Sequence, residues 1–548
     1  MPTLTINGQT LTVPAGTPVL EACVKLGIEI PRFCYHPRLP VVGNCRMCQV
    51  EIEKQPKLAV SCATPAADGM VVHTHSERAV AARRAVLEFL LLNHPLDCPI
   101  CDRGGECPLQ DFTMRHGPGE SRSREPKLHR IKHRRIGAHV VFDAERCILC
   151  TRCVRFTHHV SGTGELGVFG RGDRNEIALF PGRTLDNPYS GNVIDICPVG
   201  ALTSLDYRFK SRPWDLLRRV DSVCGLCSMG CNVTLDVRPL TKGYEVLRIR
   251  PRESDAVNAC WMCDEGRFGF TFIHDPARLG EPRVRREGGL RPVAWEDALG
   301  ALAEGLRGVV GRHGPQAVGA VASSRMTNEE AAAFARFTRE VLGSPHLDFR
   351  LRPEQAEGGD RPVDGERLLR RADKTPNSRG LRDQGLAAGG GGLDVAGMLR
   401  AAAGGRLKAL LVVEADLATA PLNGVPVREA LAALEFLAVW DLFETETGRA
   451  AHVLLPALSY AEKEGTFTNC QGRVQRVVRG LEPPGVAKPL PWVLSQVAFR
   501  LGASPLPEAP RDLWAELARR VPAYAGIAWE DIGPAGVLSG AAAAGAAR

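Results

Sequence analysis

The sequence of 548 residues lacks any apolar run near the roughly 18 residues that a membrane-spanning helix needs. Residues 1–8 alternate like a strand and lack the basic-then-apolar layout of a signal peptide. A dinucleotide-binding fingerprint is also missing: Gly170-Arg171-Gly172 is not followed by the required glycine, and the Gly389–Gly392 run follows no strand. We therefore expect a cytoplasmic chain with no direct membrane span and no catalytic hydride-transfer site.

Cysteine is absent between Cys263 and Cys470, whereas most of the 18 cysteines lie in the first half of the chain. In a cytoplasmic protein, closely spaced cysteines are metal ligands more often than disulfides. All but Cys23, Cys260 and Cys470 combine with one histidine into four ligand sets. In order, these first to fourth ligand sets are Cys34, Cys45, Cys48 and Cys62; His94, Cys98, Cys101 and Cys107; Cys147, Cys150, Cys153 and Cys197; and Cys224, Cys227, Cys231 and Cys263.

The first ligand set has the spacing C-x10-C-x2-C-x13-C. This suits a [2Fe–2S] cluster, because each iron needs two thiolates and the close pair Cys45 and Cys48 can reach over one end. A four-cysteine zinc site is the alternative, although the first gap is longer than zinc ribbons favour.

The second ligand set contains His94, one helical turn before a Cys98-Pro99-Ile100-Cys101 run. A neutral imidazole makes a [4Fe–4S] cluster about one unit more positive than a fourth thiolate would, which tends to raise its reduction potential. A zinc site of three cysteines and one histidine is the alternative on spacing alone.

The third ligand set is what remains of a two-cluster ferredoxin pattern. In the run C-x2-C-x2-C-x3-C-P, the fourth cysteine ligates the other cluster. Here Thr157 stands at the fourth position of the first run, and Cys197-Pro198 keeps only the end of a second run. One cluster of the pair is lost, and the surviving cysteines form a complete set. We therefore predict one [4Fe–4S] cluster.

The fourth ligand set reads Cys224-x2-Cys227-x3-Cys231, with a last ligand after 31 residues. Cys260 competes with Cys263 for that last place. We predict another [4Fe–4S] cluster, with zinc as the alternative.

The chain is too long for a single core, so several domains are expected. Alternating residues around Asn7-Gly8 predict a hairpin, which together with a following helix and a cysteine-rich loop indicates a small α+β domain. Ser76 is expected to cap a second helix that runs to Leu92, with Arg83 and Arg84 pointing away from its buried stripe. The predicted domains are 1–75, 76–137, 138–219, 220–275 and 276–548.

The last of these regions alternates Ala-rich amphipathic helices with short apolar strands, which predicts an α/β fold. The expected helices are 293–308 and 327–342, and the expected strands are 317–322, 408–413, 435–440 and 452–455. Residues 353–400, including the Gly389–Gly392 run, are predicted to form a mobile loop. The Ala/Gly tail from about residue 538 is expected to be disordered.

Residues 1–275 together resemble the large iron–sulfur subunit of respiratory complex I, which is the G subunit of NADH–quinone oxidoreductase. The similar tracts are Phe33-Cys34-Tyr35-His36-Pro37, Gly43-Asn44-Cys45-Arg46-Met47-Cys48, Asp97-Cys98-Pro99-Ile100-Cys101-Asp102 and Gly104-Gly105-Glu106-Cys107-Pro108-Leu109-Gln110-Asp111. The tract Cys263-Asp264-Glu265-Gly266-Arg267 is similar too, which favours Cys263 over Cys260. The resemblance implies a β-grasp [2Fe–2S] ferredoxin-like domain, a His/Cys cluster domain, a [4Fe–4S] ferredoxin-like domain and a fourth cluster domain.

The region 276–548 resembles a degenerate molybdopterin oxidoreductase domain, through the tracts Ser323–Glu330 and Glu462–Asn469. A molybdenum-dependent catalytic subunit like formate dehydrogenase is therefore the rival hypothesis. Three features argue against it: the missing cysteine ligand for the metal, the acidic Glu265 where such enzymes place a lysine, and the single cluster of the third ligand set. We expect no molybdopterin here and a structural role for the region.

The resemblance implies an oxidoreductase subunit that carries electrons from a flavin-bearing subunit toward quinone, with the fourth cluster off the main path. It implies one [2Fe–2S] and two to three [4Fe–4S] clusters. The implied partners are the flavin/NADH-binding subunit, the small [2Fe–2S] subunit and the quinone-module subunits, in the peripheral arm of complex I on the cytoplasmic face of the inner membrane. The net charge of +7 does not indicate nucleic acid, because the thiolates of four clusters would add roughly −7.

Overall fold

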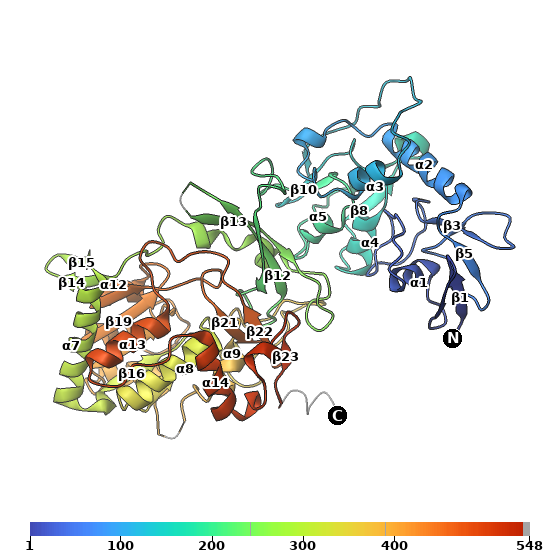
Figure 1. Cartoon of the computed structure of the whole chain (residues 1–548). Helices are drawn as coiled ribbons and strands as arrows, with labels where there is room; N and C mark the ends of the chain where they lie inside the picture. The colour runs from blue at the N-terminus through green and yellow to red at the C-terminus, as the bar shows by residue number, and fades with distance from the viewer. Residues whose placement is uncertain (242, 390, 541–548) are drawn as a thin grey trace. The chain divides into compact units, whose positions relative to one another are not determined.

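The computed structural model describes residues 1–241, 243–389 and 391–540. The chain forms two compact units, residues 1–216 and 217–548. Figure 1 colours them from blue to green and from green to red. In the described part of the chain, no helix combines the length and the apolar character that a membrane crossing requires.

The first unit begins with the predicted hairpin. Strands β1 (Thr3–Ile6) and β2 (Gln9–Thr12) are antiparallel, and Asn7 and Gly8 between them have φ of 46° and 83°. Both turn residues are left-handed, as a two-residue hairpin turn demands. Strand β1 also pairs in parallel with β5 (Val71–His73), in a sheet of order β2-β1-β5-β3-β4. Helix α1 (Val19–Lys25) packs on this sheet through Val19 and Leu20, which confirms the β-grasp fold. The other strands are β3 (Gln49–Ile52) and β4 (Ala59–Val60).

Helix α2 (Glu77–Leu91) starts as predicted, because the Ser76 side chain accepts a hydrogen bond from the Ala79 N–H at 3.3 Å. The prediction for Arg83 is wrong. Its side chain is buried, and its guanidinium donates to the Gln49 carbonyl at 2.9 Å. The helix packs against β3, so a long side chain on that face can reach a strand carbonyl while its methylene groups are covered. Arg84 is exposed, as expected.

The rest of the first unit consists of short elements joined by the cysteine-bearing loops. They are α3 (Pro108–His116), β6 (Arg134–Arg135), β7 (Val140–Phe142), α4 (Arg152–His159), β8 (Leu166–Phe169), β9 (Glu176–Leu179), α5 (Asn192–Ile196) and β10 (Leu202–Ser204). The strands form a small sheet of order β10-β7-β6 and the separate β8-β9 hairpin.

The second unit opens with an antiparallel sheet of β11 (Arg218–Val223), β12 (Asn232–Pro239) and β13 (Tyr244–Pro251), followed by the short helix α6 (Asp264–Phe268). A seven-stranded sheet of order β15-β14-β20-β19-β18-β16-β17 follows. Its strands are β14 (Arg283–Arg286), β15 (Gly289–Pro292), β16 (Val318–Val321), β17 (His346–Asp348), β18 (Ala409–Val413), β19 (Phe436–Asp441) and β20 (Val453–Pro456).

Helices cover both faces of this sheet, because alternate strand residues enter two different cores. Leu411 and Ala438 pack with the helices α7, α8 and α13, whereas Leu410 and Leu437 pack with α10 and α11. The five strands from β16 to β20 are mutually parallel, so the α/β prediction and its four strands are confirmed. The helices are α7 (Trp295–His313), α8 (Asn328–Arg336, continued by a π-helical turn over Phe337–Val341), α10 (Val395–Ala403), α11 (Val427–Ala432), α12 (Glu446–Ala450) and α13 (Leu490–Arg500).

Two loop predictions need correction. The segment 353–400 contains α9 (Ser378–Asp383) and most of α10, because its apolar residues Leu381 and Met398 are buried in the cores. Residue 390 of the glycine run lies outside the described residues. At the C-terminus, β23 (Val537–Leu538) pairs with β22 (Arg473–Val477), which pairs with β21 (Gly465–Thr468). Helix α14 (Pro510–Arg520) precedes this strand, and residues 541–548 of the predicted tail lie outside the described residues.

Candidate iron–sulfur sites

The structure brings together all four cysteines of the first ligand set. Cys34, Cys48 and Cys62 are buried and Cys45 is half-buried. The Cys34 thiol is within hydrogen-bonding reach of Cys45 and Cys62, and Cys48 is within reach of Cys62. The Cys34 N–H donates to the Cys45 Sγ at 3.4 Å. Backbone N–H groups directed at sulfur are one of the features that tune iron–sulfur clusters.

The second ligand set surrounds the start of α3. Cys107 is the residue directly before that helix, and burial raises the pKa of its thiol to about 11, with a smaller contribution from Cys101. Cys101 is buried, whereas Cys98 is exposed on a short 3-10 turn. The described interactions connect Cys98 with Cys101 and Cys101 with Cys107, and none of them includes His94.

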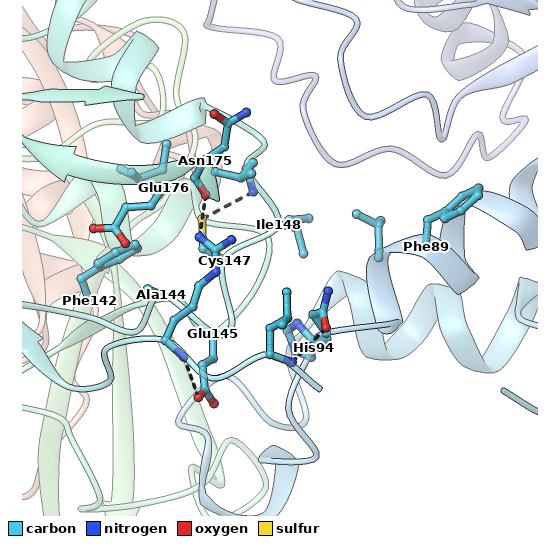
Figure 2. A pocket seen from close by; sticks show the side chains of 15 residues that line it. Phe89, His94, Phe142, Ala144, Glu145, Cys147, Ile148, Asn175 and Glu176 are labelled. Atoms are coloured by element: carbon cyan, nitrogen blue, oxygen red, sulfur yellow. Dashed lines mark hydrogen bonds between the residues drawn. The ribbon is translucent and has the colours of Figure 1, made fainter. Parts of the chain in front are cut away.

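His94 lies just beyond the end of α2 and lines a pocket that Cys147 of the third ligand set also lines (Figure 2). Its Nδ1 atom is buried, and no described residue provides it with a hydrogen-bond partner. Burial lowers the pKa of the imidazole to about 4, so the ring is neutral near pH 7. A neutral imidazole is the form that binds a metal. The residue therefore fits the ligand role on chemistry, while its position is between two ligand sets.

The third ligand set is gathered around α4. Leu149 and Thr151 are left-handed, with φ of 53° and 59°, so the loop curls and the Leu149 N–H donates to the Cys147 Sγ at 3.4 Å. Cys153 lies in the first turn of α4, and Cys197 directly follows α5. Burial raises the pKa of the Cys153 thiol, and the nearby thiols of the same set raise it further. The four cysteines thus share one buried region.

Thr157, which stands where the ferredoxin run would have its fourth cysteine, is fully buried within α4. Its hydroxyl donates to the Val154 carbonyl at 3.0 Å. The side chain acts as an ordinary helix residue, in agreement with the loss of one cluster from the two-cluster pattern.

The fourth ligand set lies in the second unit, where β11 turns into β12. The Cys224 N–H donates to the Cys231 carbonyl at 2.9 Å, which closes the loop around Cys227. Cys263 is the N-cap residue of α6, and its Sγ accepts from the Gly266 N–H at 3.4 Å. Burial raises the pKa of the Cys231 thiol, and Cys227, Cys224, Cys263 and Cys470 add to this rise. The structure therefore brings Cys263 to the other three cysteines.

The sequence had left Cys470 without a role, and the structure places it beside this set. Its backbone N–H donates to the Ser228 carbonyl at 2.8 Å, within the loop that holds Cys227. Burial raises the pKa of its thiol to about 11. Nothing in the linear spacing could have indicated this neighbour, which follows Cys231 by more than 200 residues. Cys23 is buried in the N-terminal core, as predicted.

The spatial order of the first three sets differs from their order in the sequence. Asn44 of the first set's loop donates to the Leu149 carbonyl of the third set's loop at 3.1 Å. On the other side, a Cβ added at Gly200, shortly after Cys197, would lie 2.1 Å from the Cys101 Sγ. The third ligand set is therefore packed against both the first and the second. In the described part of the chain, no three Cys, His, Asp or Glu side chains converge on a point that would hold a single ion.

The fourth ligand set borders a cavity of about 330 Å³ in the second unit, which Gly225 and Tyr460 line. The carboxyl groups of Glu414 and Asp441 face this cavity, and burial raises the pKa of Asp441 to about 7. Arg325 is its basic residue. An acidic lining does not suit an anionic pterin cofactor, so the residues present do not fit molybdopterin.

Comparisons with known families agree with this domain order. The matching models are "2Fe-2S iron-sulfur cluster binding domain" at residues 1–77, "NADH-ubiquinone oxidoreductase-G iron-sulfur binding region" at 83–122, "NADH-quinone oxidoreductase subunit 3, ferredoxin-like domain" at 137–203, "NADH-ubiquinone oxidoreductase NDSU1/NuoG-like, 4Fe-4S domain" at 217–271 and "Molybdopterin oxidoreductase" at 278–355 and 385–500. Fold and sites thus define a multi-cluster iron–sulfur protein with a molybdopterin oxidoreductase-type region. The five domain boundaries inferred from the sequence stay predictions.

Curated relatives specify the family further. The second G subunit of NADH-quinone oxidoreductase from Rhizobium meliloti is 31% identical over 726 residues, which cover 98% of this chain and 84% of that protein. The chain belongs to the family of NADH-quinone oxidoreductase G subunits. The G subunit of Streptomyces coelicolor is 45% identical over 361 residues, and the Neurospora crassa NADH-ubiquinone oxidoreductase 78 kDa subunit is 48% identical over 301 residues. These two matches cover 65% and 55% of this chain. They span only 42% and 40% of the relatives' own length.

Proposed function

We propose that this chain is an electron-transfer subunit of NADH–quinone oxidoreductase, which relays electrons from a flavin-bearing subunit toward quinone. The observation that carries the proposal is the packing of the third ligand set against both the first and the second. When bound, the clusters would accept and release one electron at a time. The residues of this chain would hold the clusters, bury them and direct N–H groups at their sulfurs.

The ligand assignment is part of this proposal. The first ligand set would hold a [2Fe–2S] cluster, and the second, third and fourth would each hold a [4Fe–4S] cluster. Support comes from the burial of the thiols, from the N–H groups at Cys45, Cys147 and Cys263, and from the unpartnered Nδ1 of His94. The path would run from the first through the third to the second set. The fourth set would lie off this path.

The partners we propose are the flavin/NADH-binding subunit, the small [2Fe–2S] subunit and the quinone-module subunits of the peripheral arm, on the cytoplasmic face of the inner membrane. A reducing compartment keeps closely spaced thiols available as ligands, which favours the cytoplasmic side. Around the second ligand set, Cys98 is exposed, and Leu96 and Ile100 beside it are 87% and 53% exposed. Apolar side chains next to an exposed ligand suit contact with another carrier.

The test is the metal content of the anaerobically purified full chain, combined with electron paramagnetic resonance after dithionite reduction. We expect about 14 iron atoms per chain, one [2Fe–2S] signal, several [4Fe–4S] signals and no molybdenum. Stoichiometric molybdenum would instead support a catalytic subunit like formate dehydrogenase. Zinc in place of iron would remove the electron-transfer proposal altogether.

A further inference from the structure

Two arginines lie between the first and the third ligand sets. Arg152 and Arg155 follow Cys150 closely and are three residues apart on α4, so they project from the same side of the helix. Arg155 is only 8% exposed. Two long cationic side chains at such a place need a reason, because burying a charge is costly unless it is well bonded.

Arg155 connects the main chains of both sets. One of its nitrogens, Nη2, donates to the carbonyl of Cys34 in the first set and, at 3.1 Å, to the carbonyl of Cys150 in the third. The Nη1 atom donates to the Pro40 carbonyl at 2.6 Å, and Nε donates to the Thr151 hydroxyl at 3.3 Å. Every nitrogen of the guanidinium therefore has a partner, and two of these partners belong to ligand residues.

Arg152 repeats this arrangement one helical turn earlier. Its Nη2 atom donates to the Tyr35 carbonyl, next to Cys34, and its Nη1 atom donates to the Ile196 carbonyl at 3.0 Å, next to Cys197. Each arginine thus joins one carbonyl from the first set's loop to one carbonyl from the third set's segments. The planar fork of a guanidinium suits such a double contact, whereas a lysine ammonium does not offer a rigid fork.

The charges of these arginines are not neutralised by acidic side chains. Among the described residues, no carboxylate forms an ion pair with Arg152 or Arg155, and all their hydrogen-bond acceptors are uncharged. The charged groups that act on both guanidiniums include the thiols of Cys34 and Cys150, one from each set. Two positive charges therefore lie between two groups of thiols.

We propose that Arg152 and Arg155 form an inter-cluster bridge, which positions the first and third cluster sites relative to each other and raises the reduction potential of both clusters. They are positioning residues, since they contact ligand main chains rather than the clusters. A nearby positive charge favours the reduced, more negative cluster, so it raises the potential. The inference rests on the proposed function. One electron leaves one cluster and enters the other, and no bond or proton changes place.

The experiment is an electron paramagnetic resonance redox titration of the full chain with all its clusters, comparing wild type with Arg155→Met. We expect both the [2Fe–2S] and the third-set [4Fe–4S] potentials to fall in Arg155→Met, by at least a tenfold change in the ratio of reduced to oxidised cluster, which is 59 mV for one electron. Arg84→Met is the matched control, because Arg84 is exposed on α2 of the same unit, and its potentials should stay at the wild-type values.

A second pair of variants separates charge from geometry. Arg155→Lys should keep both potentials near wild type while it changes the spin–spin interaction between the two reduced clusters, because the charge remains and the fork is lost. If Arg155→Met loses iron, Arg152→Met replaces it, since Arg155 keeps its own bonds there. A fall in only one potential, or shifts no larger than in Arg84→Met, would overturn the bridge. Wild-type chain without these two clusters would overturn the proposed function instead.

Discussion

Lys374 Nζ lies 2.6 Å from Glu265 Oε2, although the two residues are 109 positions apart. Glu265 belongs to α6, two residues after Cys263, and the sequence alone put an uncompensated negative charge beside the fourth ligand set. The structure supplies the opposite charge from a segment that the sequence had indicated as a mobile loop. The lysine also acts electrostatically on the thiols of Cys227 and Cys263.

The first prediction concerns this ion pair. Lys374→Met should lower the reduction potential of the fourth cluster, because Glu265 then remains as an unpaired negative charge, and Glu265→Gln should raise it. The shifts should be modest, since both side chains are partly exposed. Redox titration of each variant and of the double variant checks this. Shifts of the same sign in both single variants would contradict the pairing.

The second prediction decides between two cysteines three residues apart. Cys263→Ser should remove the fourth cluster and about four iron atoms per chain, because Cys263 is the residue that lies with Cys224, Cys227 and Cys231. Cys260→Ser is the matched control and should keep the full iron content. Iron analysis and the reduced-state spectrum measure both. Loss of iron in Cys260→Ser with retention in Cys263→Ser would reverse the assignment.

The third prediction tests His94 as a ligand. His94→Cys should keep the second cluster assembled and lower its potential, since a thiolate adds a negative charge where the imidazole is neutral. The exposed His159→Cys in the same unit is the control and should leave the potential unchanged. An unchanged potential in His94→Cys itself would count against the histidine.

The fourth prediction concerns a buried charge cluster in the second unit. Lys463 Nζ lies 3.0 Å from Glu330 and 2.9 Å from Glu414, and all three side chains are buried. Lys463→Met should destabilise this unit by about 3–5 kcal/mol, because two buried carboxylates lose the cation they share. The exposed Lys488→Met should change stability by less than about 0.5 kcal/mol. Scanning calorimetry measures both, and adding Glu330→Gln and Glu414→Gln to Lys463→Met should restore part of the loss.

The fifth prediction is a pH dependence of stability. Glu329 is almost fully buried, and burial raises the pKa of its carboxyl from 4.5 to about 7. The unfolded chain releases this proton near pH 4.5 while the folded chain keeps it, so the contribution of this group to stability is highest below pH 4.5 and falls as pH rises toward 7. The loss from this group is about 3 kcal/mol.

Glu329→Gln should flatten the fall in melting temperature between pH 4.5 and 7, because its amide cannot ionise. It should also lower stability at pH 4.5, since the carboxyl accepts from both the N–H and the hydroxyl of Thr466 at 2.8 Å. Glu304→Gln on the exposed side of α7 is the control and should keep the wild-type slope. An unchanged slope in Glu329→Gln would contradict the raised pKa.

Local patterns were sufficient for much of the secondary structure. The hairpin at Asn7-Gly8, the cap at Ser76 and the strands of the α/β sheet were all predictable, because each depends on neighbouring residues. Arg83 was mispredicted for the opposite reason. Helical periodicity shows which residues share a face, but it does not show that the Gln49 carbonyl of a neighbouring strand accepts a hydrogen bond there.

The sequence by itself determined the composition of the four ligand sets and their grouping along the chain, because ligand chemistry and loop spacing are local properties. Only the tertiary structure decided which sets are neighbours: it packs the third set against the first and second, places Cys470 beside the fourth, and brings Lys374 to Glu265. It also buries Arg152 and Arg155 between two sets. These contacts join segments far apart in the chain, and their existence depends on how helices and strands pack rather than on any pattern within one segment.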